Sequence, residues 1–199
     1  MRIGVFGGTF DPVHLGHLVL AERAREELSL ERVVWVPAGD PWRKGERLVS
    51  APAHRIAMVR LAIEGHAAFE LSTLEAERAG PSYSAETLGE LAAIRPGAEL
   101  FFVLGLDAVE DLPTWHEPQR IIELATVAAA ARSGRRLSPG ELDGLLPGLG
   151  ARTVWFEMPR LDISATELRE RTAEGRSLRY LVPEAVEAHI REHRLYQRP

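Results

Sequence analysis

The amino-acid sequence predicts an α/β fold in which helices cover both faces of a mostly parallel sheet of about six strands. Two observations support this prediction. Short apolar runs, typical of buried strands, alternate along the whole chain with longer segments of helical periodicity. The 199 residues are 45% hydrophobic and 27% charged, as expected for a globular chain with one sizeable core. We therefore expect residues 1–199 to form a single domain.

Each expected strand is a run of apolar residues bounded by glycine, proline or charge. The expected strands are Arg2–Phe6, Arg32–Pro37, Phe69–Ser72, Leu100–Leu104, Thr126–Ala131 and Thr153–Phe156. The expected helices are Leu18–Leu28, one opened by Pro52, Ala85–Ile94, Pro118–Leu124 and, as C-terminal helices, Ser164–Glu174 and Pro183–His193. We predict a loop at Ala38–Ser50, whereas Arg132–Gly150, which is rich in glycine and polar residues, is the segment whose structure the sequence determines least. Strands joined through helices make right-handed crossovers, so the sheet is doubly wound and Rossmann-like, with ligands beyond the carboxyl ends of its strands.

Composition excludes several classes of protein. The formal net charge of −5 argues against a general binder of nucleic acids or membrane surfaces. The chain has no cysteine, which excludes disulfides, thiol catalysis and cysteine-ligated metals. No apolar run approaches the roughly 20 residues of a membrane span, and the N-terminus does not resemble a signal peptide. We expect a cytoplasmic protein.

The most informative stretch runs from Gly7 to His17, directly after the first expected strand. Paired glycines let a backbone approach a bulky ligand, and a helix start offers free N–H groups to an anion. His14 and His17 are three residues apart, so on one helical turn they share a face and can reach one phosphate group. Paired glycines or a lone histidine are common in ordinary turns and caps. Their combination between a strand and a helix favours a phosphate site.

Two further segments follow expected strands and carry phosphate-binding residue types. Ser164, with Glu167 three residues later, matches a capping box, which is useful at any helix start. The same helix start adds the hydroxyl of Thr166 and the guanidinium of Arg169, which favours an anion site. Lys44 is the only lysine in the chain, and its ordinary interpretation is a solvated loop charge.

The stretch Gly7–His17 resembles the signature of the nucleotidylyltransferases with an (H/T)xGH motif, and most closely that of the nicotinate-nucleotide adenylyltransferase family. The resemblance continues in family order through Pro41–Lys44, Gly80–Ser84, Gly105–Asp107, Leu112–Trp115 and Ile163–Arg169. Two residues depart from the pattern: Arg43 stands where histidine is usual, and Ala165 replaces a second serine. The family reaction is adenylyl transfer from ATP to nicotinate mononucleotide, which gives deamido-NAD and pyrophosphate.

The resemblance implies three overlapping sets of site residues. The implied catalytic residues are His14, His17, Lys44 and Arg169. The implied ATP-binding residues are Gly7, Gly8, Thr9, Phe10, His14, His17, Gly105, Asp107, Ser164, Thr166 and Arg169. The implied nicotinate mononucleotide-binding residues are Lys44, Ser84, Asp107, Trp115, His116 and Arg132.

The residues fit this chemistry. An indole such as that of Trp115 suits the cationic pyridinium ring, through a cation–π contact worth about 0.5–2 kcal/mol. The mononucleotide phosphate has a second pKa of about 6, so the nucleophile is already anionic near neutral pH. Mg²⁺ is expected as a cofactor that bridges substrate phosphates rather than one held in a protein cage. No protein metal site is expected, because His54, His66, His189 and His193 are scattered in the sequence without ligand spacing.

Two alternatives stay open. One is a related transferase that accepts nicotinamide mononucleotide or a pantetheine phosphate. The other is a non-catalytic module that senses ATP or NAD. The expected partners are ATP and nicotinate mononucleotide, without nucleic acid or membrane, and the chain is a possible homo-oligomer.

Overall fold

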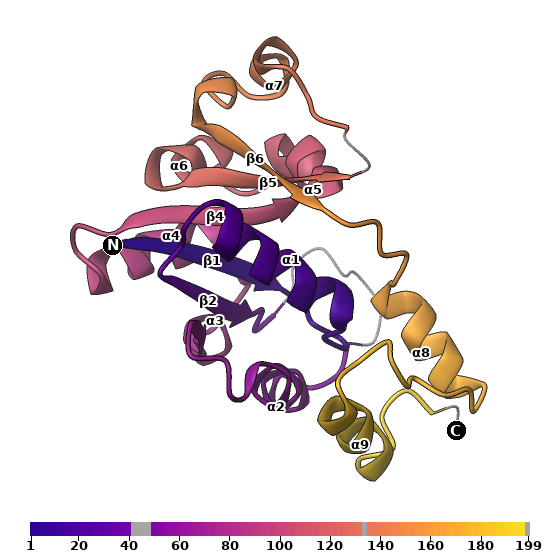
Figure 1. Cartoon of the computed structure of the whole chain (residues 1–199). Coiled ribbons are helices and arrows are strands. Elements are labelled where there is room, and N and C mark those ends of the chain that lie inside the picture. Colours follow the sequence, from indigo (N-terminus) through magenta and orange to yellow (C-terminus); the bar gives the residue numbers. More distant parts are fainter. Residues whose placement is uncertain (41–48, 133–134, 198–199) are drawn as a thin grey trace.

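The computed structural model describes residues 1–40, 49–132 and 135–197. Its strands form one six-stranded sheet in the order β3-β2-β1-β4-β5-β6, and every neighbouring pair is parallel (Figure 1). The strands are β1 (Arg2–Gly8), β2 (Arg32–Pro37), β3 (Phe69–Leu71), β4 (Glu99–Gly105), β5 (Thr126–Arg132) and β6 (Thr153–Met158). The predicted Rossmann-like α/β fold is confirmed.

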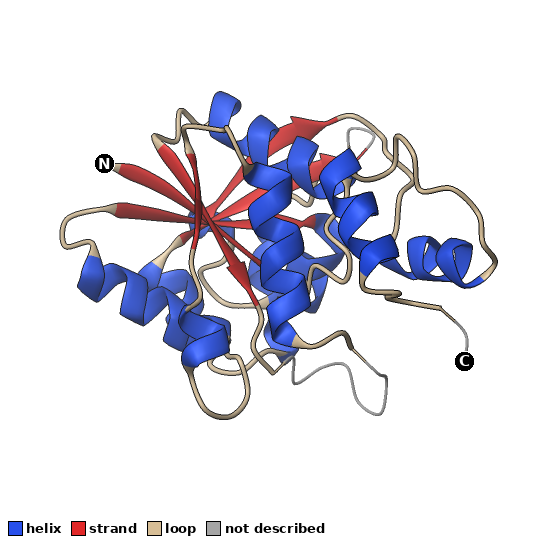
Figure 2. Cartoon of the chain, turned by 90° about the horizontal axis from the view of Figure 1, so that it is seen from below, coloured by secondary structure: helices blue, strands red, loops and turns tan. Residues whose placement is uncertain are grey.

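Helices cover both faces of this sheet, as Figure 2 shows. On one face lie α1 (Leu15–Glu27), α2 (Pro52–Ile63), α8 (Ala165–Ala173) and α9 (Glu184–Glu192). On the other lie α4 (Ser84–Ile94), α5 (Leu106–Asp111), α6 (Pro118–Leu124) and α7 (Pro139–Leu145). Short turns of helix complete the described elements: α3 (Leu74–Glu77), η1 (Leu112–Thr114) and η2 (Gly150–Arg152). Each set of four helices buries its own hydrophobic cluster against the sheet.

The central strand β4 shows how one sequence supplies both clusters. Its side chains alternate between faces, because successive residues of a strand point in opposite directions. Phe101 and Val103 join the α1 and α2 side, whereas Phe102 and Leu104 join the α4 and α6 side. A strand covered on both faces is therefore apolar at every interior position, and the sequence of β4 predicts a buried strand for this reason.

The strand order places a switch point between β1 and β4. These two strands pair directly, with Val5 opposite Phe102. After β1 the chain turns to one face and forms α1, and after β4 it turns to the other face and forms α5. Open α/β sheets bind ligands in the crevice at such a switch point, beyond the carboxyl ends of the strands.

Two predicted boundaries near this crevice are wrong. Gly7 and Gly8 are the last residues of β1 and pair with β2, so they are not a turn. Helix α1 begins at Leu15 rather than Leu18. The early start has no apolar periodicity, because its first turn contains Gly16 and His17. An apolar pattern alone cannot reveal such a start.

Segment 132–150, whose structure the sequence determines least, contains α7. Ser138 begins this helix through a capping box: its Oγ accepts a hydrogen bond from the Glu141 amide (3.3 Å), and the Glu141 carboxylate accepts one from the Ser138 amide (2.8 Å). Pro139 then occupies the first helical turn, where its missing N–H costs nothing. The cap outweighs the poor helix propensity of the glycines that follow.

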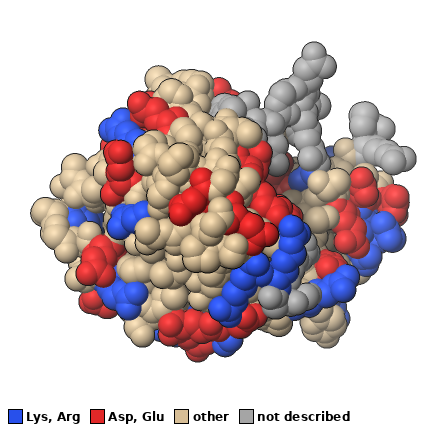
Figure 3. Space-filling model, turned by 90° about the horizontal axis from the view of Figure 1, so that it is seen from above, with Lys and Arg blue, Asp and Glu red and all other residues tan. Residues whose placement is uncertain are grey.

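Charged side chains of both signs cover one face of the molecule. On the face drawn in Figure 3, acidic and basic side chains are interspersed. Because charges of both signs are mixed there, a negatively charged ligand must be bound by locally placed donors and cations.

Over residues 1–40, 49–132 and 135–197, the structure contains no helix long and apolar enough to cross a membrane.

Candidate active site

The loop after β1 turns sharply and buries an aromatic ring. Phe10 has a left-handed backbone (φ 51°), which is uncommon for a residue with a side chain. Its ring is 2% exposed and packs edge-on against Phe6 and His17, with ring centroids 5.4 and 5.1 Å away. A Cβ at Gly8 would lie 2.9 Å from the same ring. Gly8 is therefore required by the packing of Phe10 beneath the loop.

His14 and His17 form a stacked pair at the start of α1. His14 is the extended N-cap residue and His17 lies in the first turn, with ring centroids 3.7 Å apart. The His14 amide donates to Nδ1 of His17 (3.2 Å). A Cβ on Gly16 would approach Nδ1 of His14 to 3.0 Å, so glycine between the histidines leaves room for the stack. The prediction that both rings share one face of the first turn is confirmed.

Both imidazoles are held in the neutral form. His14 is 6% exposed, and burial lowers its pKa to about 4. Burial also lowers the pKa of His17 well below its ordinary value, and the neighbouring His14 adds to the effect. Within the described residues, Nδ1 of His14 has no hydrogen-bond partner although it is buried. An anion at this helix start would stabilise the protonated rings and raise both pKa values.

Helix α8 contacts the same loop. Arg169 donates through Nη1 to the backbone carbonyl of Asp11 and through Nη2 to Oγ1 of Thr166 (3.0 Å). Ser164 is the N-cap, and its Oγ accepts a hydrogen bond from the Glu167 amide (3.2 Å), which is the serine half of the predicted capping box. The structure therefore brings Ser164, Thr166 and Arg169 beside the loop that leads to His14.

The carboxyl end of β4 forms the opposite wall of the crevice. Gly105 caps α5, and a Cβ there would meet none of the described atoms within 4 Å, which leaves open space over its backbone. Asp107 is exposed in the first turn of α5. Trp115 follows η1 and packs edge-on against Phe102, with centroids 6.0 Å apart. It is half-buried against the core.

Two segments distant in sequence meet near the start of α4. The exposed His116 ring stacks on Tyr83 at a centroid separation of 4.1 Å, and Ser84, the next residue, begins α4. Gly80 enables the preceding turn through a left-handed backbone (φ 90°). This ring contact brings together the two segments that hold the predicted residues Ser84 and His116.

Two predicted residues cannot be placed by their side chains. Lys44 lies outside the described residues. Arg132 is the last residue of β5, at the same edge of the sheet as the ends of β1 and β4, but its side chain also lies outside the described part of the structure.

Arg55 was not predicted from the sequence to lie at this site. It belongs to α2 and is 1% exposed. Its guanidinium donates to the carbonyls of Thr9 (3.0 Å), Gly39 (2.9 Å), Ser50 (2.9 Å) and Ala38. Burial lowers its pKa, and the charge of Asp11 opposes that shift. No spacing distinguishes this arginine from a solvated helix charge, since its partners are backbone carbonyls without a sequence signature.

Tyr196 was not predicted either. It follows α9 in the sequence and contacts the loop between β1 and α1. Its hydroxyl donates to Oδ1 of Asp11 (2.6 Å), whose Oδ2 accepts from the Ser50 amide (3.2 Å). Burial first, and then the charge of Asp11, raises the pKa of Tyr196. The loop between β1 and α1 is thus held by residues from four other segments of the chain.

The sheet order and the polar side chains gathered beyond β1 are typical of the doubly wound α/β proteins, which bind ligands outside the carboxyl ends of their strands. Comparison with known proteins narrows this class. A profile of the cytidylyltransferase-like family matches residues 5–171. A probable nicotinate-nucleotide adenylyltransferase from Dehalococcoides mccartyi is 42% identical over 200 residues, covering 100% of this chain and 98% of the relative. One from Thermomicrobium roseum is 44% identical over 196 residues, covering 98% and 92%.

Solved structures agree on the fold. The nicotinic acid mononucleotide adenylyltransferase of Plasmodium falciparum, solved as a complex with NaAD, superposes with a TM-score of 0.80 at 17% identity and covers 98% of this chain and 97% of that one. The full-length sequence matches are far above chance similarity. The chain belongs to the cytidylyltransferase-like family and, within it, to the nicotinate-nucleotide adenylyltransferases. The resemblance found in the sequence is confirmed.

Proposed function

We propose that this protein transfers the adenylyl group of ATP to nicotinate mononucleotide, giving deamido-NAD and pyrophosphate in NAD biosynthesis. The observation that carries the proposal is the stacked pair His14 and His17 at the start of α1, beside Arg169. These groups converge at the switch point of the sheet. Membership in the nicotinate-nucleotide adenylyltransferases supports nicotinate mononucleotide as the acceptor.

The reaction forms a bond from a phosphate oxygen of the mononucleotide to the α-phosphorus of ATP and breaks the bond between that phosphorus and the pyrophosphate. The nucleophile is anionic near neutral pH, so positioning and charge stabilisation are the main requirements. His14, His17 and the N–H groups of α1 would bind the triphosphate, and Arg169 with Lys44 would neutralise the leaving group. The negative charge of the phosphates would raise the pKa values that burial lowers in the free protein.

The donors around the loop are suited to phosphate oxygens. Imidazole, guanidinium, hydroxyl and amide groups line it, and both carboxylate oxygens of Asp11 already accept hydrogen bonds from Tyr196 and Ser50. This arrangement fits a Mg²⁺ ion held by the substrate phosphates rather than by a cage of carboxylates. When bound, the ion would offset the charge that builds up on the pyrophosphate.

The other end of the crevice would bind nicotinate mononucleotide. We assign the pyridinium ring to Trp115, a ribose hydroxyl to Asp107, and the carboxylate to the backbone around Ser84 and His116. What supports this assignment is the contact between the start of α4 and the segment after η1. Arg132 follows the neighbouring strand β5 and is proposed for the mononucleotide phosphate. ATP and nicotinate mononucleotide are thus the proposed partners; homo-oligomerisation and a cytoplasmic location stay predictions.

The test is pyrophosphate release from ATP and Mg²⁺ with nicotinate mononucleotide or its amide as acceptor. We expect strong preference for the acid. Equal use of both would retain the transferase and reject the carboxylate assignment, whereas nucleotide binding without turnover would indicate a sensing module. His17→Ala should lower kcat/KM at least about 100-fold, because it removes a donor to the charged phosphates. His66→Ala is the matched control. His66 precedes β3, so it lies near the amino end of a parallel strand, whereas the site lies beyond the carboxyl ends.

A further inference from the structure

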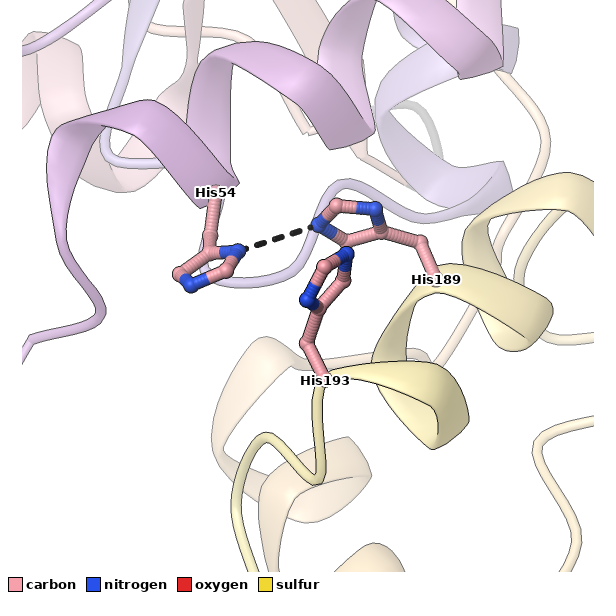
Figure 4. Close-up of side chains that lie close together, drawn as sticks. All are labelled: His54, His189 and His193. Carbon is pink, nitrogen blue, oxygen red and sulfur yellow. Dashed lines mark hydrogen bonds between the residues drawn. The ribbon is translucent and has the colours of Figure 1, made fainter.

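Three histidines outside the crevice converge where α2 and α9 pack together. His54 lies in the first turn of α2, His189 lies in α9, and His193 caps the end of α9. Figure 4 shows the three rings pointing toward one another from the two helices. The sequence-based description of them as scattered is wrong, because His189 and His193 are one helical turn apart and the fold brings His54 to both.

We propose that His54, His189 and His193 form a binding site for a divalent transition-metal ion, with Zn²⁺ the best-suited ion. Imidazole nitrogens are preferred ligands of zinc, nickel and copper, and histidines four residues apart on a helix present them on one face. Three imidazoles leave the fourth position of a tetrahedral ion for water or another ligand. The proposal departs from the expectation that the chain holds no metal.

The distances suit such an ion. One ligand nitrogen from each ring can be chosen so that all three lie within 4.8 Å of one another. Nδ1 of His54 and Nε2 of His189 are 3.2 Å apart. Two nitrogens on a tetrahedral zinc are about 3.3 Å apart, given Zn–N bonds of about 2.0–2.1 Å. The exposed ring of His193 can close the remaining distance by rotation, without repacking the core.

The cluster lies at the edge of an apolar interface, with one carboxylate nearby. His54 and His189 are half-buried, and the interface beneath them is apolar: Met58 of α2 and Ile190 of α9 belong to one hydrophobic cluster. The carboxylate of Glu192 acts on His189 as a nearby negative charge. Without a metal, the short contact between His54 and His189 is a hydrogen bond whose donor depends on the tautomer. That arrangement is the alternative that the experiment must separate from a metal site.

The experiment titrates untagged, metal-free protein with Zn²⁺ against a chromophoric chelator. We expect one tightly bound equivalent, and at least about 10-fold weaker binding in His189→Gln and His193→Gln, because loss of even an outer-shell group costs that much. His66→Gln, which removes a histidine outside the cluster, should bind as the parent does. Mg²⁺ should not compete, since it prefers oxygen ligands.

Thermal unfolding gives a second measurement. Free Zn²⁺ at about 100 times its Kd should raise the Tm by roughly 5–10 °C in the parent and not in His193→Gln. Near-ultraviolet circular dichroism of each variant verifies that its packing is intact, and exposed His193 is the position least able to disturb it. Absence of stoichiometric zinc binding would overturn the proposal. Equal zinc binding by the parent and by His193→Gln would also overturn it, and this is the result expected if His14 and His17 bind the zinc instead.

Discussion

The buried His14 makes a quantitative prediction about acid stability. In the unfolded chain its imidazole gains a proton near pH 6.5, whereas burial in the native protein delays protonation until about pH 4. Between these values the unfolded state binds more protons, so protonation favours unfolding as the pH falls. The stabilising contribution is complete above pH 6.5 and is lost as the pH drops toward 4. From pH 7.5 to pH 5 the loss is about 2 kcal/mol for this one group.

Urea unfolding of the parent and of His14→Asn at pH 7.5, 6.5, 5.5 and 5 measures this contribution. The variant lacks the titrating group, so its free energy of unfolding should fall about 2 kcal/mol less than the parent's over that range. Each protein is compared with itself at pH 7.5, which cancels the cost of the substitution. Parallel curves for the two proteins would refute the claim that His14 is buried and neutral.

Three more substitutions test the construction of the site. Gly16→Ala should improve helix propensity yet lower kcat/KM by roughly 10- to 100-fold, because its Cβ would displace the His14 ring. Steady-state kinetics measure the loss of activity, and urea unfolding measures the stability of the same variant. Arg55→Met should lower the free energy of unfolding by about 2–4 kcal/mol, since it leaves several part-buried carbonyls without donors, and a loss under 1 kcal/mol would contradict this account. Tyr196→Phe should cost about 1.5–3 kcal/mol by removing one hydrogen bond to the Asp11 carboxylate, as denaturant unfolding would reveal; unchanged stability would mean that water replaces the hydroxyl.

The fold could be predicted from sequence because its strands are covered on both faces. Continuous apolar runs such as Leu100–Leu104 identify themselves, and all six predicted strands are present. Helix starts were less predictable where capping replaces apolar periodicity, as at His14 and Ser138. Local hydrogen bonds determine these boundaries, and a search for hydrophobic periodicity does not detect them.

The site residues also fall into two groups, those that a local sequence pattern identifies and those that it does not. His14, His17 and Arg169 could be found because their chemistry lies in short motifs next to strand ends. Arg55 and Tyr196 act through backbone carbonyls and through one carboxylate far away in the chain, so no local pattern marks them. The three-histidine cluster was missed for a related reason, because His54 joins the other two only through the packing of α2 on α9.

The bond between Tyr196 and Asp11 has a consequence for the order in which the protein is made. The two residues are 185 positions apart, and Arg169, which also binds Asp11, comes 158 positions after it. At about 5–20 residues per second, a ribosome needs roughly ten seconds or more to make the intervening chain. The first loop to be synthesised is thus among the last to acquire its partners. A nascent chain can form the early strands and the α4 side of the core, whose buried residues end at Leu149, while its phosphate site stays incomplete until the final segment emerges.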